Sequence, residues 1–286
     1  MPQNREIATR FTSRETIEGA GVRLRRAFGF SELPLFDPFL MLDDFRAERP
    51  EDYLAGFPWH PHRGIETVTY MLAGRVEHGD SMGNAGSVDA GSVQWMTAGS
   101  GIIHQEMPKP INGAMGGFQL WVNLPSRNKM MDPRYQEIPA DGIPVVRAGN
   151  DVTVKVISGS FGGVTGPVRD IVADPAFLDL TVPAGARFGV EVKEGYTVFA
   201  YVIGGRGAFD RSGREAVDHD LVLFSDGDRI LATAIGTIPF RFLLISGKPI
   251  REPIAWRGPI VMNTEEELRQ AFREYRDGTF VRARKR

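Results

Sequence analysis

Hydrophobic and polar positions along this chain alternate over short distances for most of its length. Runs rich in Val, Ile, Thr, Phe and Tyr recur, mostly separated by Gly, Asp or Pro, at residues 67–73, 92–96, 118–124, 152–157, 198–203 and 240–245. Short runs of β-forming residues bounded by turn residues are typical of strands in many-stranded domains. The pattern predicts an all-β fold, of jelly-roll sandwich or barrel type.

One segment near the end of the chain has a helical period instead. Thr264 and Glu267 form a T-x-x-E capping box, and Gly278 supplies a stop signal. Between them, apolar side chains recur at helical spacing at Leu268, Ala271, Phe272 and Tyr275. We expect one amphipathic helix from about 264 to 277, docked on the sheets.

An internal echo points to a duplicated module. The segment 67–74 (TVTYMLAG) resembles 197–204 (TVFAYVIG), with an offset of 131 residues when Tyr70 is aligned with Tyr201. The region between the copies is rich in Pro and Gly, as linkers are. We therefore expect an N-terminal domain over 1–135, a linker over 136–150 and a C-terminal domain over 151–286.

Composition and charge narrow the classes of function. The 286 residues contain 34 Lys and Arg against 36 Asp and Glu, so the chain has no excess of positive charge with which to bind the phosphate backbone of a nucleic acid. Cysteine is absent, which excludes disulfides, thiolate metal sites and a Cys nucleophile. The first 18 residues lack the apolar core of a secretion signal, and no apolar run approaches the roughly 18 residues that span a bilayer. We expect a cytoplasmic protein without a membrane or nucleic-acid partner.

Three of the five histidines gather with carboxylates in the first half of the chain. His60 and His62 form an H-x-H pair, and His104 and Glu106 form an H-x-E pair about 40 residues later. Side chains at i and i+2 of a strand project from the same face, so each pair can aim at one point. Two facing strands would bring four ligands together, which predicts a metal site built from imidazoles and a carboxylate.

Glu66 competes with Glu106 for the carboxylate role, because it lies four residues after His62 and shares its face by parity. Periodicity alone does not choose between them. At roughly 3.3 Å per residue, Glu66 would lie about 13 Å along the strand from His62, so we expect it in an outer or structural role.

Several other residues carry weaker expectations. Under the Tyr70/Tyr201 alignment the second copy has Glu191 and Lys193 where the first has His60 and His62, so we expect no metal there. We expect His78 in an exposed turn. We expect the aromatic side chains near the histidine pairs to belong to the sandwich core, namely Trp95, Phe118 and Trp121.

The stretches HPHRGIETVTY (60–70) and GSVQWMTAGSGIIHQEMP (91–108) resemble the pirin family of bicupins. The likeness extends to DPFLMLDDF (37–45) and to WRGPIVMNTEEE (256–267), and it is looser over 140–250. The resemblance implies two cupin-type jelly-roll β-sandwich domains and one mononuclear metal in the N-terminal copy. It assigns the ligands to His60, His62, His104 and Glu106, and gives Glu66 no part in the metal site.

The metal implied by the resemblance is Fe(II), although Mn, Ni, Co, Cu or Zn also suit three imidazoles and one carboxylate. The function implied is that of the pirin-type quercetin 2,3-dioxygenases, which use O₂ on a flavonol-like, enol or catechol substrate. Glu106 is then the expected catalytic base. The resemblance leaves open a non-enzymatic alternative, an iron-containing pirin that acts as a redox-sensing regulator or binds a protein partner. We expect a monomer.

Overall fold

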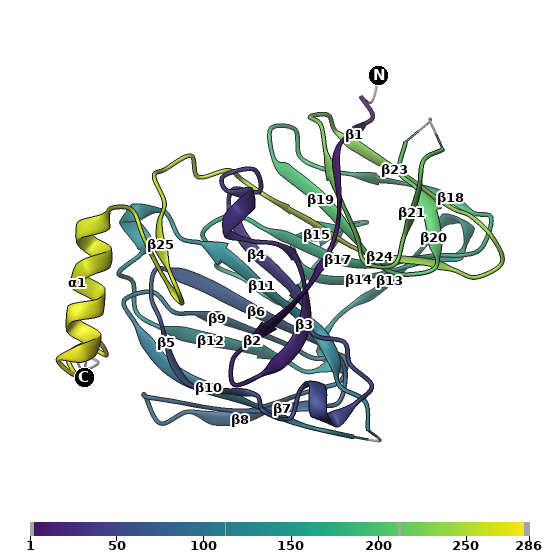
Figure 1. Ribbon diagram of the computed structural model, residues 1–286. Helices are drawn as coiled ribbons and strands as arrows, with labels where there is room; N and C mark the ends of the chain where they lie inside the picture. Colours follow the sequence, from purple (N-terminus) through teal and green to yellow (C-terminus); the bar gives the residue numbers. More distant parts are fainter. Residues whose placement is uncertain (1–2, 112, 211–212, 283–286) are drawn as a thin grey trace. The chain divides into compact units, whose positions relative to one another are not determined.

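The computed structural model describes residues 3–111, 113–210 and 213–282 (Figure 1). It divides the chain into two compact units, each built from two separate segments. The histidine-bearing unit comprises Arg14–Asp141 and Ile250–Arg286, and the second unit comprises Met1–Ser13 and Gly142–Pro249. These units do not coincide with the contiguous halves expected from the sequence. The N-terminal segment packs in the second unit, and the C-terminal segment packs in the histidine-bearing unit.

The histidine-bearing unit has two antiparallel sheets. A seven-stranded sheet has the order β12-β9-β6-β11-β4-β3-β2, and a four-stranded sheet has the order β5-β10-β7-β8. The strands are β2 (Arg14–Glu18), β3 (Val22–Phe28), β4 (Phe39–Asp44), β5 (Phe57–His62), β6 (Ile65–Ala73), β7 (Arg75–Asp80), β8 (Ala85–Asp89), β9 (Val93–Thr97), β10 (Ile102–Lys109), β11 (Gly116–Asn123) and β12 (Arg134–Ile138).

The C-terminal segment completes this unit. The hairpin β25 (Ala255–Arg257) and β26 (Ile260–Met262) leads into α1 (Glu265–Arg276), which Figure 1 shows beside β25. Thr264 caps the helix by accepting a hydrogen bond from the Glu267 amide, and the Glu267 side chain accepts one from the Thr264 amide in return. The expected helix is thus confirmed. Leu268 and Ala271 bury its apolar face.

The second unit repeats the same design. Its sheets have the orders β1-β22-β19-β24-β17-β14-β13 and β18-β23-β20-β21, beside a small β15-β16 hairpin. The strands are β1 (Ile7–Thr12), β13 (Val145–Ala148), β14 (Val152–Ser158), β15 (Ser160–Phe161), β16 (Val164–Thr165), β17 (Ala176–Val182), β18 (Arg187–Glu191), β19 (Thr197–Gly204), β20 (Arg206–Ala208), β21 (Glu215–Val217), β22 (Asp220–Phe224), β23 (Arg229–Ala234) and β24 (Phe240–Gly247).

The matching strand orders explain the sequence echo, since β6 and β19 occupy the same place in their sheets. They also explain the division of the chain. Strand β1, from the start of the sequence, pairs with β22 in the second unit, while β26 is bridged to Arg63 in the histidine-bearing unit. The all-β class is confirmed. Short 3₁₀ turns link strands at Phe30–Glu32, Pro50–Asp52, Ser126–Asn128, Ala140–Gly142 and Gly149–Asp151.

Candidate metal centre and cavity

Strands β5 and β10 bring the three predicted histidines together. His60 lies directly opposite His104 in the antiparallel register, and His62 projects from the same face two residues along β5. One ring nitrogen from each of the three side chains falls within 4.8 Å of the other two. The register shifts between His104 and Glu106, where β5 carries Pro58, as expected for a bulge that accommodates proline.

Backbone carbonyls fix the orientation of two of the rings. His60 Nδ1 lies 2.8 Å from the Pro58 carbonyl, and His62 Nδ1 lies 3.1 Å from the Pro259 carbonyl. A carbonyl can only accept, so both Nδ1 atoms carry the proton and both Nε2 atoms present lone pairs. These two Nε2 atoms face each other at 3.0 Å. Two lone pairs so close together repel each other unless a cation lies between or beside them.

His104 supplies an independent observation. Its side chain is buried, and neither ring nitrogen has a hydrogen-bond partner among the described residues. Buried polar groups are rarely left without a partner, and each one needs an explanation. Three convergent imidazole nitrogens, one of them orphaned, fit a transition metal, which prefers such donors. The geometry therefore suits a metal held by His60, His62 and His104.

Burial keeps these imidazoles neutral. It lowers the pKa of His60, and it lowers the pKa values of His62 and His104 well below the ordinary histidine value, with further lowering from the neighbouring imidazoles. The neutral ring is the form that binds a metal, so the site needs no proton loss from these groups near neutral pH.

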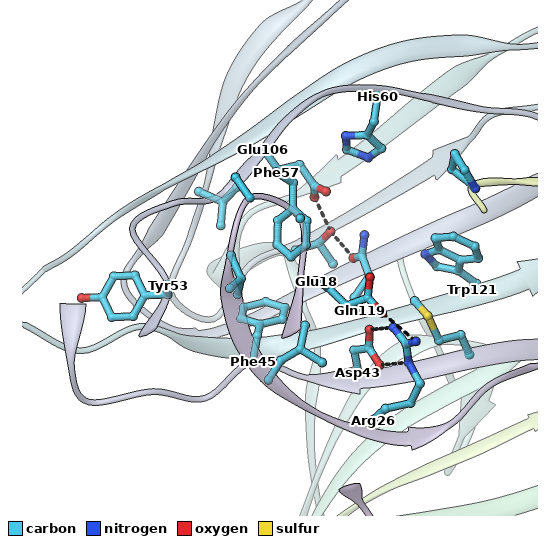
Figure 2. Close-up of a pocket in the computed structure, with 18 of the residues that line it drawn as sticks. Glu18, Arg26, Asp43, Phe45, Tyr53, Phe57, His60, Glu106, Gln119 and Trp121 are labelled. Atoms are coloured by element: carbon cyan, nitrogen blue, oxygen red, sulfur yellow. Dashed lines mark hydrogen bonds and ion pairs between the residues drawn. The ribbon is translucent and has the colours of Figure 1, made fainter. Parts of the chain in front are cut away.

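Glu106 lies on the same face of β10 as His104 and lines a cavity together with His60 and His62 (Figure 2). Its Oε1 is 3.2 Å from the Thr69 hydroxyl, which is itself 2.7 Å from the Gln119 side-chain oxygen. A hydroxyl donates only one hydrogen bond, so the other contact requires a proton on Glu106 or an amide N–H turned towards Thr69. Burial raises the pKa of Glu106 to about 7, which is consistent with either arrangement.

Glu66 occupies a different environment. It lies on β6 opposite Thr97 and accepts a hydrogen bond of 2.8 Å from the Thr97 hydroxyl. Thr69, three residues along the same strand, lines the cavity, so strand alternation directs Glu66 to the other face of the sheet. The sharp bend at Gly64 separates His62 from Glu66 into two strands, which is why parity counted along the sequence misleads here.

A cavity of about 610 Å³ opens onto His60 and His62. Trp121 packs edge-on to His62 with ring centroids 5.1 Å apart, and Trp256 lies 5.7 Å from Trp121. Trp121 was expected in the sandwich core, but its indole forms part of the cavity wall, whereas Trp95 and Phe118 are fully buried. Aromatic and aliphatic side chains make up most of the wall, namely Phe30, Met41, Phe45, Phe57, Val76, Met115, Trp121 and Trp256.

The sequence expectation for His78 is wrong. His78 lies within β7, directly opposite Glu106 in the register, and is buried rather than exposed in a turn. Its Nε2 lies 2.7 Å from the more exposed Glu137 carboxylate. The signal that could have found it is the alternation of Val76, His78 and Asp80 on one face of this strand, all three of which are buried.

The second unit carries different chemistry at the equivalent place. Glu191 and Lys193 replace the first histidine pair and line a cavity of about 940 Å³. Lys193 is ion-paired with Asp174, and the Tyr196 hydroxyl donates a 2.7 Å hydrogen bond to the same carboxylate. These groups satisfy one another.

Comparisons with known proteins agree with this geometry. The family model Pirin matches residues 21–122, and the model of the pirin C-terminal cupin domain matches residues 177–281. A pirin-like protein of Caulobacter vibrioides is 46% identical over 93% of this chain and 95% of its own length. Human pirin is 40% identical over 97% of this chain and 94% of its own length.

A solved structure shares nearly the whole fold. The crystal structure of a quercetin 2,3-dioxygenase from Acinetobacter baumannii superposes with a TM-score of 0.89 at 30% identity, covering 97% of this chain and 99% of that one. The expected cupin-type fold is confirmed. With two family models that together span most of the sequence, this chain belongs to the pirin family.

Proposed function

We propose that this protein is a metal-dependent dioxygenase that acts on a flavonol-like substrate or on another enol or catechol. The observation that carries the proposal is the cavity of about 610 Å³ that opens onto His60 and His62, two of the three clustered imidazoles. Pockets of roughly 300 to 1,000 Å³ with mainly apolar walls and a few polar groups are typical of small-molecule sites. A sealed site would have favoured the non-enzymatic alternative. The dioxygenase structure with which the chain superposes supports the same reading.

We assign the metal ligands to His60, His62, His104 and Glu106, with one metal per chain. Fe(II) is the metal we favour, and Mn, Ni, Co, Cu and Zn accept the same donors. When bound, the metal supplies the redox and Lewis-acid chemistry that side chains lack. None of the described helices is long and apolar enough to cross a membrane.

The chain's own residues account for binding and proton transfer. Trp121 and Trp256 present an aromatic wall against which a planar ligand can pack beside His62. Glu106 lines the cavity beside His60 and His62 and is suited to take the proton from an enol or phenol hydroxyl. Apolar walls exclude water from the bound substrate, which strengthens each polar contact.

Oxygen uptake tests the proposal directly. Protein purified with its metal, at close to one metal per chain, should consume oxygen when quercetin is added. His104→Ala should lose most of the metal and the oxygen uptake, while His219→Ala, in the second unit, should lose neither. Oxygen uptake that persists in metal-free protein would contradict the proposal. Metal binding without oxygen uptake would leave the ligand assignment standing and remove the enzyme assignment.

A further inference from the structure

A row of polar side chains crosses the floor of the cavity. Arg26 on β3, Asp43 on β4, Gln119 on β11, Thr69 on β6 and Gln94 on β9 lie directly opposite one another in successive strand pairs. We call these five residues the polar row. Its first four members line the cavity, and the hydrogen bond from Thr69 joins the row to Glu106 (Figure 2).

The fold itself does not require this row. With Thr69 aligned to Ala200, the same path across the second unit's sheet runs through Val156, Leu178, Leu244, Ala200 and Val222. We call these residues the apolar row, and all five are buried members of one hydrophobic core. Since burying polar groups costs free energy, the polar row is best explained by what the cavity binds.

The end of the row farthest from the histidines is an ion cluster. Arg26 holds Asp43 through two contacts of 2.8 and 2.7 Å and Glu18 through one of 2.8 Å. These contacts with described residues use three of the five guanidinium N–H groups. The Arg26 side chain is 30% exposed and that of Glu18 is 39% exposed, so both can meet a ligand.

The charge of this cluster selects the kind of group that it can bind. One guanidinium and two carboxylates carry a net negative charge, which disfavours a carboxylate or phosphate on the ligand. A neutral hydroxyl fits both halves of the cluster, because it accepts a hydrogen bond from the guanidinium and donates one to a carboxylate.

The length of the row indicates the size of the ligand. Thr69 and Arg26 are separated by three strand spacings of about 4.8 Å, which places the cluster about 14 Å across the sheet from the residue that contacts Glu106. Figure 2 shows Gln119 between Arg26 and His60, with apolar side chains around them. A planar aromatic molecule of two or three rings can bridge this distance.

We propose that Arg26, Asp43 and Glu18 form a specificity subsite for aromatic ligands with hydroxyl groups on the ring remote from the histidines. This inference rests on the proposed function and deepens it. A flavonol with a hydroxylated outer ring is preferred to one in which that ring is bare, and a carboxylated outer ring is rejected.

Ligand binding without turnover tests the subsite. All four tryptophans, Trp59, Trp95, Trp121 and Trp256, belong to the histidine-bearing unit, so quenching of their fluorescence reports on this cavity. Metal-loaded protein should be titrated without oxygen with quercetin, whose outer ring has two hydroxyls, and with galangin, whose outer ring has none. We expect the parent protein to bind quercetin about tenfold more tightly, as two hydrogen bonds allow.

The double substitution Arg26→Met with Asp43→Leu removes the pair without leaving an unpaired buried charge. This double variant should bind quercetin more weakly and galangin with nearly unchanged affinity, so the preference for quercetin should disappear. The matched control is Arg241→Met with Asp179→Leu, which removes a similar two-contact pair from the second unit and should keep the preference. Glu18→Gln, at a more exposed position, should reduce the preference about threefold and tests the inference even if the double variant fails to fold.

The outcomes separate this inference from the proposed function. A parent protein without preference, or a preference that survives these substitutions, would overturn the subsite even if quercetin is consumed. Conversely, a preference that depends on Arg26 and Asp43 in a protein that consumes no oxygen would support the subsite and remove the dioxygenase assignment.

Discussion

The two units share one strand order but differ in what they place between their sheets. In the second unit Phe209, Phe224, Phe240 and Phe242 pack with aliphatic side chains into one hydrophobic core, beside the cavity lined by Glu191 and Lys193. In the histidine-bearing unit the same space holds a cavity, three imidazoles and the polar row. The second copy has a cavity as well, but it builds the same strand path from apolar side chains alone, so the polar residues that replace them in the other copy need a functional explanation.

Replacing one residue of the apolar row by its counterpart in the polar row, and the reverse, should give the largest difference in the free energy of unfolding. Leu244→Gln puts an amide among the buried apolar side chains beside the second cavity, where it loses the burial of leucine and has no polar partner in the apolar row. We expect a loss of about 4 kcal/mol in the free energy of unfolding, measured by circular dichroism during urea titration. The reverse change, Gln119→Leu, should alter it by less than about 1 kcal/mol, because the Thr69 hydroxyl can still donate to Glu106. Equal costs would show that the polar row stabilises its unit as the apolar row does.

The two glutamates of the histidine-bearing unit should separate almost as clearly. Glu106→Gln keeps the size of the side chain and removes its charge, so oxygen uptake with quercetin should fall at least about 100-fold and metal content should also fall. Glu66→Gln, on the other face of the sheet, should retain most of the metal. Elemental analysis of both variants checks this, and metal content that follows Glu66 would refute the assignment of Glu106.

The buried Lys129 should give the histidine-bearing unit its own pH dependence. Burial lowers the pKa of Lys129 to about 7, while its Nζ donates to the oxygens of Gly64, Asn123 and Val261. Because the unfolded chain holds this proton up to a higher pH, stability should rise between pH 7 and 10. We expect a gain of about 2 kcal/mol, which is less than the full pKa shift implies because three oxygens stabilise the ammonium.

Tryptophan fluorescence during denaturant titrations at pH 7 and pH 10 isolates this unit, and Lys129→Met should remove the gain. A Lys129→Met variant that keeps the same rise with pH would assign it to other groups.

The helix cap should have the smallest effect. Thr264→Ala removes the side chain that accepts from the Glu267 amide, and should cost about 1 kcal/mol in the unfolding of the histidine-bearing unit. Thr264→Ser should restore most of it. The described part of the second unit has no α-helix, so its unfolding should not respond to either change.

Many of the secondary-structure elements, and the side of a strand on which a residue lies, can be predicted from the local pattern of hydrophobic and polar residues. Alternation predicted the strands, helical spacing predicted α1, and the i, i+2 rule placed His60 beside His62 on one face. These features depend on neighbours in the sequence. By contrast, the polar row joins residues from five strands, and strand register decides that Arg26 and Gln119 both lie opposite Asp43. Periodicity determines which face a residue occupies, but it does not determine which residue lies opposite.

The division of the chain was also beyond local pattern. A Pro- and Gly-rich stretch suggested a cut near 136–150, but part of it forms β12 and β13, which pair within sheets. Pairing of β1 with β22 joins positions about 200 residues apart, and the composition of β1 does not predict this partner. Likewise, Trp121 could be assigned to the cavity only after the facing walls were known.

The interleaving of the two units has a consequence for synthesis of the protein on the ribosome. The carbonyl of Pro259 orients His62, and the Trp256 indole completes the wall beside Trp121, yet both follow His104 by more than 150 residues in the sequence. Arg63, next to His62, is likewise held by Glu274. A nascent chain that has already exposed all three histidines therefore lacks the parts that orient and enclose them. If the site holds the metal that we propose, loading is expected only after residues 256–274 have left the exit tunnel.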